Sequence, residues 1–440
     1  MPDTDKNKQS DFMIEKIKDR PVNKKKLLRR TVTTATMAVI FGLIACLTFL
    51  ILEPVFSNWL YPEEEPQSIV FPEEADEMSP EDMIVEEDDA STIQEVVESV
   101  ILEEEQIQKI LDNIKLDKNH YVQLFNSMGS YTTELSYSLV TVTGVSSDVD
   151  WMNQTYESEG QTYGVIIASN GKEYLILTDA NIVNQSESTK VTFCDGTQIE
   201  AVVKQTDNQT GLAVLSVFIA LMPETTQSEV RVAMLGSSNA KDLTRTPVIA
   251  MGCPMGMMGS VGYGMIAAPS STLYKVDANY KLLTTDIYGS SNSTGVLFNM
   301  QGQIIGIITP NRVNSDLKNS VTAIGISELR KLIENMSNGK EATYMGISGM
   351  DVTVAANQEM AVPFGAYVKE VDMDSPAMLA GIQPGDVIVE IDESSIENFN
   401  NYTAALLRLD SDQTVSVVVQ RMVQDSYREM EIEITLGTVK

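Results

Sequence analysis

A series of short apolar runs, separated by turn residues, begins at Ser138 and sets narrow limits on the fold. The runs recur about every 8–12 residues, and the pairs Asn170-Gly171 and Asp195-Gly196 mark tight turns between them. The predicted strands include Leu139–Val142, Gly164–Ala168, Tyr174–Thr178, Val191–Phe193, Ile199–Val203, Leu212–Val217 and Val248–Met251. Many short strands of this kind predict antiparallel barrels or sandwiches. An amphipathic helix over Glu328–Met336, capped by Ser327, is expected to end the series.

The stretch Thr284–Ile308 reads strand, serine-rich turn, strand, glycine turn, strand, with Ser293 at the tip of the first turn. It resembles the nucleophile loop of trypsin-like serine proteases of the HtrA/Deg family, in which Gly-Asn-Ser-Gly-Gly-Pro-Leu follows a Thr-Asp pair. The matching residues are Asn292, Ser293, Gly295, Leu297, Asn299 and Gly306-Ile307. Ser291, Thr294 and Val296 differ, and the run from Asp286 to Ser293 is one residue short. The resemblance implies a mostly β, chymotrypsin-like double β-barrel, which we place at residues 131–340.

The residues from Tyr344 to about Val439 resemble a PDZ domain, which we place at 341–440. The motif Tyr344-Met345-Gly346-Ile347 matches the carboxylate-binding loop of the HtrA type. Gly346 would leave backbone N–H groups free to hold a C-terminal carboxylate, and the adjoining strand edge would accept a peptide by β-addition. We therefore expect the domain to bind peptides or unfolded protein segments, and the alternative is a PDZ-shaped domain that only braces the body.

The resemblance also assigns the positions of a catalytic triad, and two of them carry other residue types. A trypsin-like triad needs a Ser nucleophile, a His that takes its proton and an Asp that orients the imidazole. The family's His falls at Asn181, within Leu177–Val183, and its Asp falls at Gly211, within Thr210–Leu215. An amide has no basic lone pair near neutral pH, so Asn181 cannot serve as a general base.

The sequence has a single His, His120, which precedes the predicted barrel. The oxyanion hole implied by the resemblance uses the N–H of the nucleophile and of the residue two before it, where Ser291 replaces a Gly. We therefore predict a pseudoprotease, in which Ser293 is a residual nucleophile position. The alternative is an active serine endopeptidase of the HtrA/Deg type, in which Ser293 works with a non-standard base or a residue from a partner protein.

The N-terminal part predicts a single-pass membrane protein. Residues 1–30 are polar and basic, and residues 31–54 are largely apolar, with no charge from Thr31 to Leu52. As a helix this run is long enough to cross a bilayer core of about 30 Å. A cleavable signal peptide is the alternative, but no small-residue cleavage site follows the run. The basic flank predicts a cytoplasmic N-terminus with the later domains outside, which suits the cell membrane of a Gram-positive-type bacterium.

Two further segments separate the apolar run from the barrel. Residues 55–90 are acidic and interrupted by prolines, a composition typical of a disordered stalk. Residues 91–130 are predicted to be helical, because Ser91–Gln94 has the form of a capping box and apolar residues then recur with helical spacing. This helix could form a short coiled coil that joins several copies into a homo-oligomer, or it could lie on its own domain.

The charge balance excludes one class of partner. Lys and Arg total 31 against 62 Asp and Glu, so we expect no binding to nucleic acid. The 3 cysteines do not form a disulfide framework; Cys194 and Cys253 could pair, or act as two small buried side chains. No cofactor and no metal site is predicted, since the acidic stretch lacks the ligand spacing of a calcium loop.

Overall fold

The structure is a computed structural model, and it describes residues 28–29, 32–46, 48, 67–72, 118–149, 155–239, 243–268, 271–310, 319–424 and 426–438. The protein divides into two units, residues 1–65 and residues 66–440. In the first unit, residues 32–46 are helical. Within the described part of the protein, no helix is both long and apolar enough to cross a membrane. Part of the predicted anchor at 31–54 lies outside the described residues, so the anchor stays a prediction.

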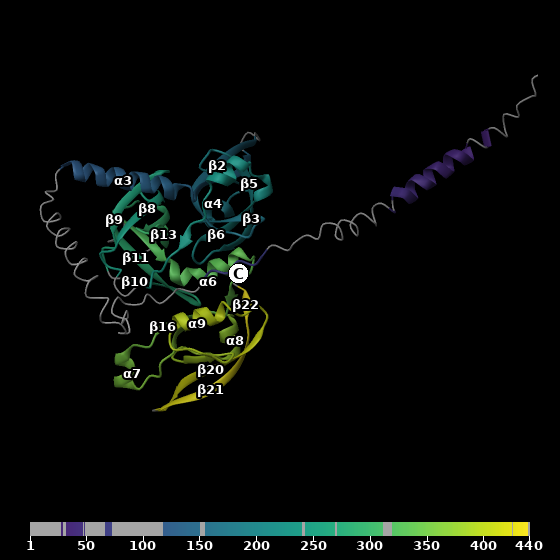
Figure 1. Ribbon diagram of the computed structural model, residues 1–440. Helices are drawn as coiled ribbons and strands as arrows, with labels where there is room; N and C mark the ends of the chain where they lie inside the picture. Colours follow the sequence, from purple (N-terminus) through teal and green to yellow (C-terminus); the bar gives the residue numbers. More distant parts are fainter. Residues whose placement is uncertain are drawn as a thin grey trace, which may run out of the picture. The chain divides into compact units, whose positions relative to one another are not determined.

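Six antiparallel strands close the first barrel, in the order β1-β2-β3-β6-β5-β4 (Figure 1). The strands are β1 (Leu139–Val149), β2 (Thr155–Ser169), β3 (Glu173–Asp179), β4 (Ser188–Thr192), β5 (Gln198–Asp207) and β6 (Leu212–Phe218). Apolar side chains of these strands fill the barrel, and Ile166, Ile176 and Leu215 are fully buried. As predicted, Asn170 and Gly171 form the β2–β3 turn: the Asn170 side chain accepts a hydrogen bond from the Lys172 N–H, and Gly171 has a φ of 83°.

Helix α4 (Ala180–Asn184) lies between β3 and β4 of the first barrel. Two further short helical segments, η2 (Ile219–Leu221) and α5 (Glu224–Glu229), connect this barrel to the second sheet. The second sheet has eight strands, in the order β10-β11-β14-β13-β12-β8-β9, with β7 on β13. These strands are β7 (Met234–Leu235), β8 (Pro247–Cys253), β9 (Ser260–Met265), β10 (Ser271–Lys275), β11 (Ala278–Tyr288), β12 (Thr294–Asn299), β13 (Gln303–Ile308) and β14 (Ser320–Gly325). A bridge between Ile266, directly after β9, and Thr285 in β11 joins the two sides of this sheet.

Helix α6 (Ile326–Ser337) leads from the second sheet to the PDZ region, and its apolar face, including Leu329 and Ile333, packs into the largest core cluster. The helix begins two residues earlier than predicted. Its N-cap is Gly325, because the predicted cap, Ser327, instead accepts a hydrogen bond from the Ser238 N–H at 2.8 Å.

A short piece of the predicted stalk lies against α6, which differs from the expectation of disorder over 55–90. The Asn338 side chain donates to the Ile69 carbonyl and accepts from its N–H, both at 2.9 Å. The Phe71 N–H donates to the Glu334 carboxylate at 3.1 Å, and the side chains of Ile69 and Phe71 pack against the core. Backbone hydrogen bonds and two apolar side chains together hold this piece against α6.

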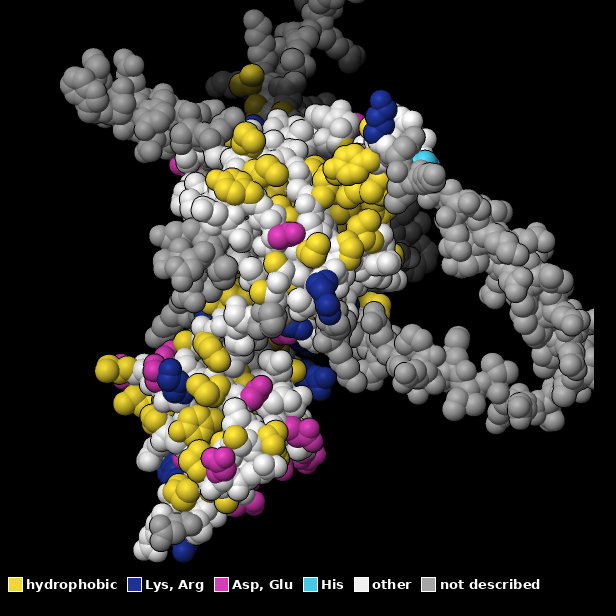
Figure 2. All heavy atoms as spheres, turned by 90° about the vertical axis from the view of Figure 1, so that its left-hand side faces the viewer, with side chains coloured by type: hydrophobic (Ala, Val, Ile, Leu, Met, Phe, Trp, Pro, Cys, Tyr) yellow, Lys and Arg dark blue, Asp and Glu magenta, His cyan; other side chains and the backbone are white. Residues whose placement is uncertain are grey.

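Helix α3 (Lys118–Ser136) covers the last part of the predicted helical segment and continues past its predicted end at residue 130. Residues 91–117 of that segment lie outside the described part of the protein. Its C-terminal half packs on the body through Tyr131 and Leu135. Its N-terminal half carries His120 and exposes the apolar residues Tyr121, Val122, Leu124 and Phe125. Figure 2 shows hydrophobic side chains gathered near this histidine, which is coloured cyan.

The PDZ region is built on the sheet β16-β17-β18-β20-β21, with β19 on β18 and a separate β15–β22 pair. Its strands are β15 (Thr343–Tyr344), β16 (Ile347–Asp351), β17 (Ala366–Val371), β18 (Val387–Ile391), β19 (Ser394–Ser395), β20 (Thr414–Val423), β21 (Ser426–Thr435) and β22 (Gly437–Thr438). Its helices are α7 (Val354–Met360), α8 (Pro376–Ala380) and α9 (Phe399–Leu406). A core of its own, centred on Phe399 and Tyr402 of α9, lies under this sheet.

Candidate functional site

Three segments bring two of the predicted triad positions, Asn181 and Gly211, together with the residue that follows Ser293. Asn181 lies in the first turn of α4, Gly211 directly precedes β6, and Thr294, the residue after Ser293, opens β12. All three line a common cavity of about 20 Å³. This volume is roughly enough for one water molecule and far too small for a peptide side chain. The first barrel and the second sheet thus meet here, with little space between them at this point.

Ser293 does not line that cavity. It is 3% exposed, and its Oγ accepts a hydrogen bond from the Ser290 N–H at 2.8 Å. The same Oγ lies within donating distance of two carbonyl oxygens, those of Ser290 (2.8 Å) and Pro254. A nucleophilic Ser should instead direct its hydroxyl at a base and at the substrate. Ser293 is therefore held by its own loop and by the segment that follows β8.

Backbone N–H groups at the predicted oxyanion hole also form hydrogen bonds within the loop. The Ser293 N–H donates to the Ser290 carbonyl at 3.1 Å, which closes a turn. The Asn292 N–H donates to the Ser290 hydroxyl at 3.1 Å, and the Ser291 side chain is exposed. An oxyanion hole needs donors that point at the position of the developing charge. The Ser293 N–H, one of the two donors expected for the oxyanion hole, is therefore already used within the loop.

Asn181, which the resemblance places at the position of the triad histidine, is hydrogen-bonded to Asp179. Asp179 is the N-cap of α4, and its Oδ1 accepts both the Asn181 N–H at 2.7 Å and the Asn181 side-chain amide at 2.8 Å. This arrangement stabilises the start of a short helix. It supplies no group that can take a proton from a serine hydroxyl near neutral pH.

Gly211, which the resemblance places at the position of the triad aspartate, has a φ of 76°, a conformation that favours glycine. Its carbonyl accepts from the Ala180 N–H at 2.8 Å, which ties the turn to α4. A nearby acid that the sequence did not single out is Asp207, and it is buried. The Asp207 carboxylate accepts from the Thr210 N–H (2.7 Å) and hydroxyl (2.5 Å), so it shapes this turn.

Because the Ser293 hydroxyl is bonded on several sides, Ser293→Ala should destabilise the protein. We expect the free energy of unfolding to fall by about 1–2 kcal/mol, since the partly buried Ser290 N–H loses its acceptor. Urea denaturation measures this change. Ser291→Ala, at the exposed neighbouring position, is the control and should stay within about 0.5 kcal/mol of the parent. Equal stability of the two variants would contradict the buried bonding of Ser293.

The remaining residues singled out in the sequence lie apart from this cavity. His120 is on α3, before the barrel, as predicted. Cys194 and Cys253 are both free thiols, so they do not pair. Cys253 is buried in β8, and Cys194 is exposed, which differs from the expectation of a buried side chain.

The predicted carboxylate-binding loop, Tyr344 to Ile347, holds a carboxylate from the same protein. Asp277, in the turn between β10 and β11, is 5% exposed. Its Oδ2 accepts the N–H groups of Met345 and Gly346, both at 2.8 Å, and its Oδ1 accepts that of Ile347 at 2.9 Å. The three N–H groups predicted to hold a peptide carboxylate are thus occupied.

The buried Asp277 carboxylate has a fourth hydrogen-bond donor besides the three backbone N–H groups. Tyr402 in α9 donates its hydroxyl to Asp277 Oδ1 at 2.5 Å. Burial raises the pKa of Asp277, whereas its four donors favour the ionised form and act in the opposite direction. Burial also raises the pKa of Tyr402, and the neighbouring Asp277 carboxylate raises it further. Nothing in the sequence around Asp277 indicated this role, because its partners lie far away in the sequence.

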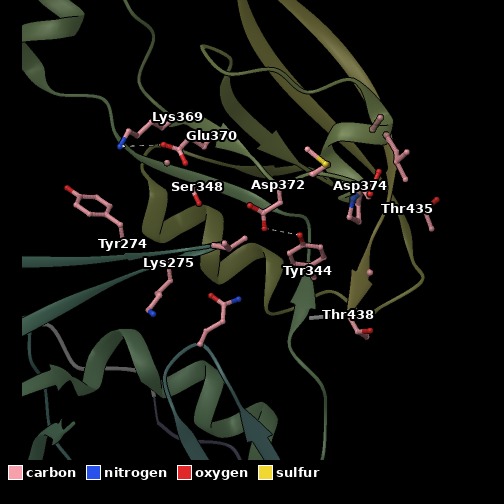
Figure 3. A pocket seen from close by; sticks show the side chains of 18 of the residues that line it. Tyr274, Lys275, Tyr344, Ser348, Lys369, Glu370, Asp372, Asp374, Thr435 and Thr438 are labelled. Atoms are coloured by element: carbon pink, nitrogen blue, oxygen red, sulfur yellow. Dashed lines mark hydrogen bonds and ion pairs between the residues drawn. The ribbon is translucent and has the colours of Figure 1, made fainter. Parts of the chain in front are cut away.

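Beside this contact lies a cleft of about 1420 Å³, shown in Figure 3. Tyr274 and Lys275 of β10 lie on one side, and residues of β16 and β17 such as Ser348 and Lys369 lie on the other. The Tyr344 hydroxyl at the edge of the cleft donates to Asp372 at 3.0 Å. The candidate peptide site therefore adjoins a space large enough for several side chains.

Comparisons with known proteins agree with this architecture. A trypsin-like peptidase domain model matches residues 162–307, and a PDZ domain model matches residues 367–421. A solved structure described as the HtrA-type protease AlgW with a decapeptide superposes with a TM-score of 0.50 at 21% identity. The match covers 70% of this protein and 98% of that structure, and it supports the fold.

Several relatives are serine proteases by name. The Serine protease Do-like HtrA of Lactobacillus helveticus is 29% identical over 301 residues, which is 64% of this protein and 69% of the relative. A DegP-like periplasmic serine endoprotease of Halomonas elongata is 29% identical over 56% of this protein and 50% of its own length. HhoB of Synechocystis is 29% identical over 54% of this protein, and the match spans only 58% of HhoB.

Proposed function

We infer that this protein, a trypsin-like peptidase domain joined to a PDZ domain with HtrA/DegP serine proteases as homologues, is a pseudoprotease that binds peptides. The observation that carries this proposal is the replacement of the catalytic base by Asn181, whose side chain is bonded to Asp179. The backbone bonds of the Ser293 hydroxyl support it independently. In a well-studied serine protease, loss of the His alone lowers turnover by about 10⁶-fold.

The peptide-binding part of the proposal rests on the PDZ region. Three consecutive N–H groups converge on a carboxylate, and β16 is an edge strand, with its other edge on β17. These two features are what a peptide end needs for recognition by β-addition. We propose that the ligands are the C-termini or the unfolded segments of other proteins, and that the protein works in envelope quality control or as a scaffold.

A cleavage assay tests the pseudoprotease proposal. The full-length protein and its Ser293→Ala variant are incubated with unfolded casein, and fragments are followed by mass spectrometry. We expect the same background from both proteins, because no base is placed to activate Ser293. Cleavage by the parent that disappears in Ser293→Ala would overturn the proposal and favour the alternative, an active HtrA/Deg-type endopeptidase with an unusual base.

We also propose that the apolar run at 31–54 anchors the protein in the cell membrane, with the basic tail in the cytoplasm and the β domains outside. Protease treatment of intact cells that express the protein tagged at both ends tests this arrangement. Loss of the C-terminal tag alone is expected, and loss of the N-terminal tag alone would reverse the orientation.

A further inference from the structure

We propose that Asp277 is an internal ligand of the PDZ carboxylate-binding loop, and that the C-terminus of another protein binds there by displacing it. The proposal rests on the peptide-binding function proposed above and adds its regulation. In the resting protein the site would be closed by the β10–β11 turn, and a client would have to compete with this turn.

Asp277 offers the loop the groups that a C-terminal residue would offer. Its carboxylate oxygens accept the three N–H groups of Met345, Gly346 and Ile347. Its own N–H donates to the Ile347 carbonyl at 2.7 Å. A bound peptide end would present the same donor and the same pair of oxygens, the donor from its last residue and the oxygens from its α-carboxylate. Here the side chain takes the place of the α-carboxylate.

The backbone at Asp277 explains how an internal residue can do this. Lys275 pairs with Ala278, so Asp277 lies at the tip of a two-residue turn, with a φ of 60°. Asp is one of the residues that tolerate this left-handed conformation. The backbone then turns back, while Thr403 donates to the Asp277 carbonyl at 2.9 Å and holds the tip against α9.

The turn also covers the edge of β16 that β-addition would use. Asp277 bonds the carbonyl of Ile347, and the Asn279 side chain donates to the carbonyl of Gly349 at 3.2 Å. Both acceptors belong to β16, the edge strand of the PDZ sheet. An incoming peptide would need these same carbonyls, so the turn and the peptide cannot occupy the site together.

The competition is between a tethered ligand and a free one. A tethered group acts at an effective concentration of up to about millimolar. The apparent affinity for a free peptide is then the affinity of the open site multiplied by the fraction of time that the site is open. The adjoining cleft, lined by Tyr274 and Lys275 opposite Ser348 (Figure 3), gives the turn space to withdraw into.

The test compares the full-length protein with Asp277→Ala and a matched control, Asp412→Ala. Asp412 also has a positive φ, 64°, but it is exposed. Two quantities are measured: hydrogen exchange of the amides at 345–347, and binding of fluorescent decapeptides that end in an apolar residue with a free carboxylate. The same peptides with a C-terminal amide serve as the ligand control. Asp277→Asn, which keeps the size and removes the charge, replaces Asp277→Ala if that variant does not fold.

We expect faster exchange at 345–347 in the Asp277 variant and an increase of about 10- to 100-fold in affinity for the free-acid peptides only, with Asp412→Ala like the parent. Equal exchange rates and equal peptide affinities in the parent and the Asp277 variant would overturn the internal-ligand proposal while peptide binding stands. Faster exchange without binding of any peptide would instead overturn the peptide-binding function.

Discussion

Replacing Gly295 by Ala is expected to lower the free energy of unfolding by about 3–5 kcal/mol, one of the two largest effects that we predict. Gly295 follows Thr294 in β12 and pairs with Gly252 of β8. Its φ is 134°, and a Cβ atom at this position would overlap the Met251 carbonyl oxygen. In Gly295→Ala the energetic cost of backbone strain would therefore add to that of the clash with the Met251 carbonyl oxygen. Urea denaturation, with hydrogen exchange of β8 and β12 as a local readout, measures the loss.

The control for this prediction is Gly339→Ala. Gly339 also has a positive φ, 69°, but no atom lies within 4 Å of the position that its Cβ would take. Only backbone strain of about 1 kcal/mol is expected there. An equal loss at both glycines would contradict the close approach of β8 and β12. The predicted difference would explain why Gly295, which matches the nucleophile motif, is present together with an Asn at the predicted position of the catalytic base.

The second large effect is expected for Asp386→Ala, which should lower the free energy of unfolding of the PDZ region by about 3 kcal/mol. Asp386 is 1% exposed, and its two oxygens accept Nε and Nη2 of Arg421, both at 2.7 Å. The Gln383 N–H also donates to it at 2.9 Å. Hydrogen bonding to Asp386 raises the pKa of Arg421, so the arginine stays charged and would lose its partner.

Glu370→Ala is the matched control for Asp386→Ala. Glu370 pairs with Lys369 at 3.8 Å, and both side chains are largely exposed. Exposed pairs of this kind contribute about 0–1 kcal/mol, so the midpoint of unfolding should barely move. Thermal unfolding of both variants, followed through hydrogen exchange of β18 and β20, shows whether Asp386→Ala loses more stability than Glu370→Ala. Similar losses would mean that the Asp386–Arg421 pair is not the one that stabilises this domain.

Much of the fold could be predicted from local patterns. The run Leu212–Val217 forms most of β6, and the Asp195-Gly196 turn lies between β4 and β5. These features depend on residues close in sequence, which is why periodicity finds them. The stalk contact could not be found in this way: the acidic composition of 55–90 conceals Ile69 and Phe71, whose partners lie on α6 and directly after it.

The candidate site was predictable in position but not in detail. Asn181 and Gly211 do converge near the residue after Ser293, because the strand framework places them there. The closed state of Ser293 depends on its bonds to Ser290 in its own loop and to Pro254, which directly follows β8, and spacing alone does not specify these bonds. Asp277 was missed entirely, since its partners are 68 to 70 residues away, with Tyr402 further still.

The measurement that tests the central claim most directly is the intact mass of the full-length protein after treatment with a fluorophosphonate probe. This probe adds to a serine hydroxyl only where a base and an oxyanion hole activate it. With Asn181 in place of the base and the Ser293 hydroxyl bonded to its own loop, we predict that the mass does not change. A single adduct on the parent protein that is absent from Ser293→Ala would show an activated nucleophile and contradict the account.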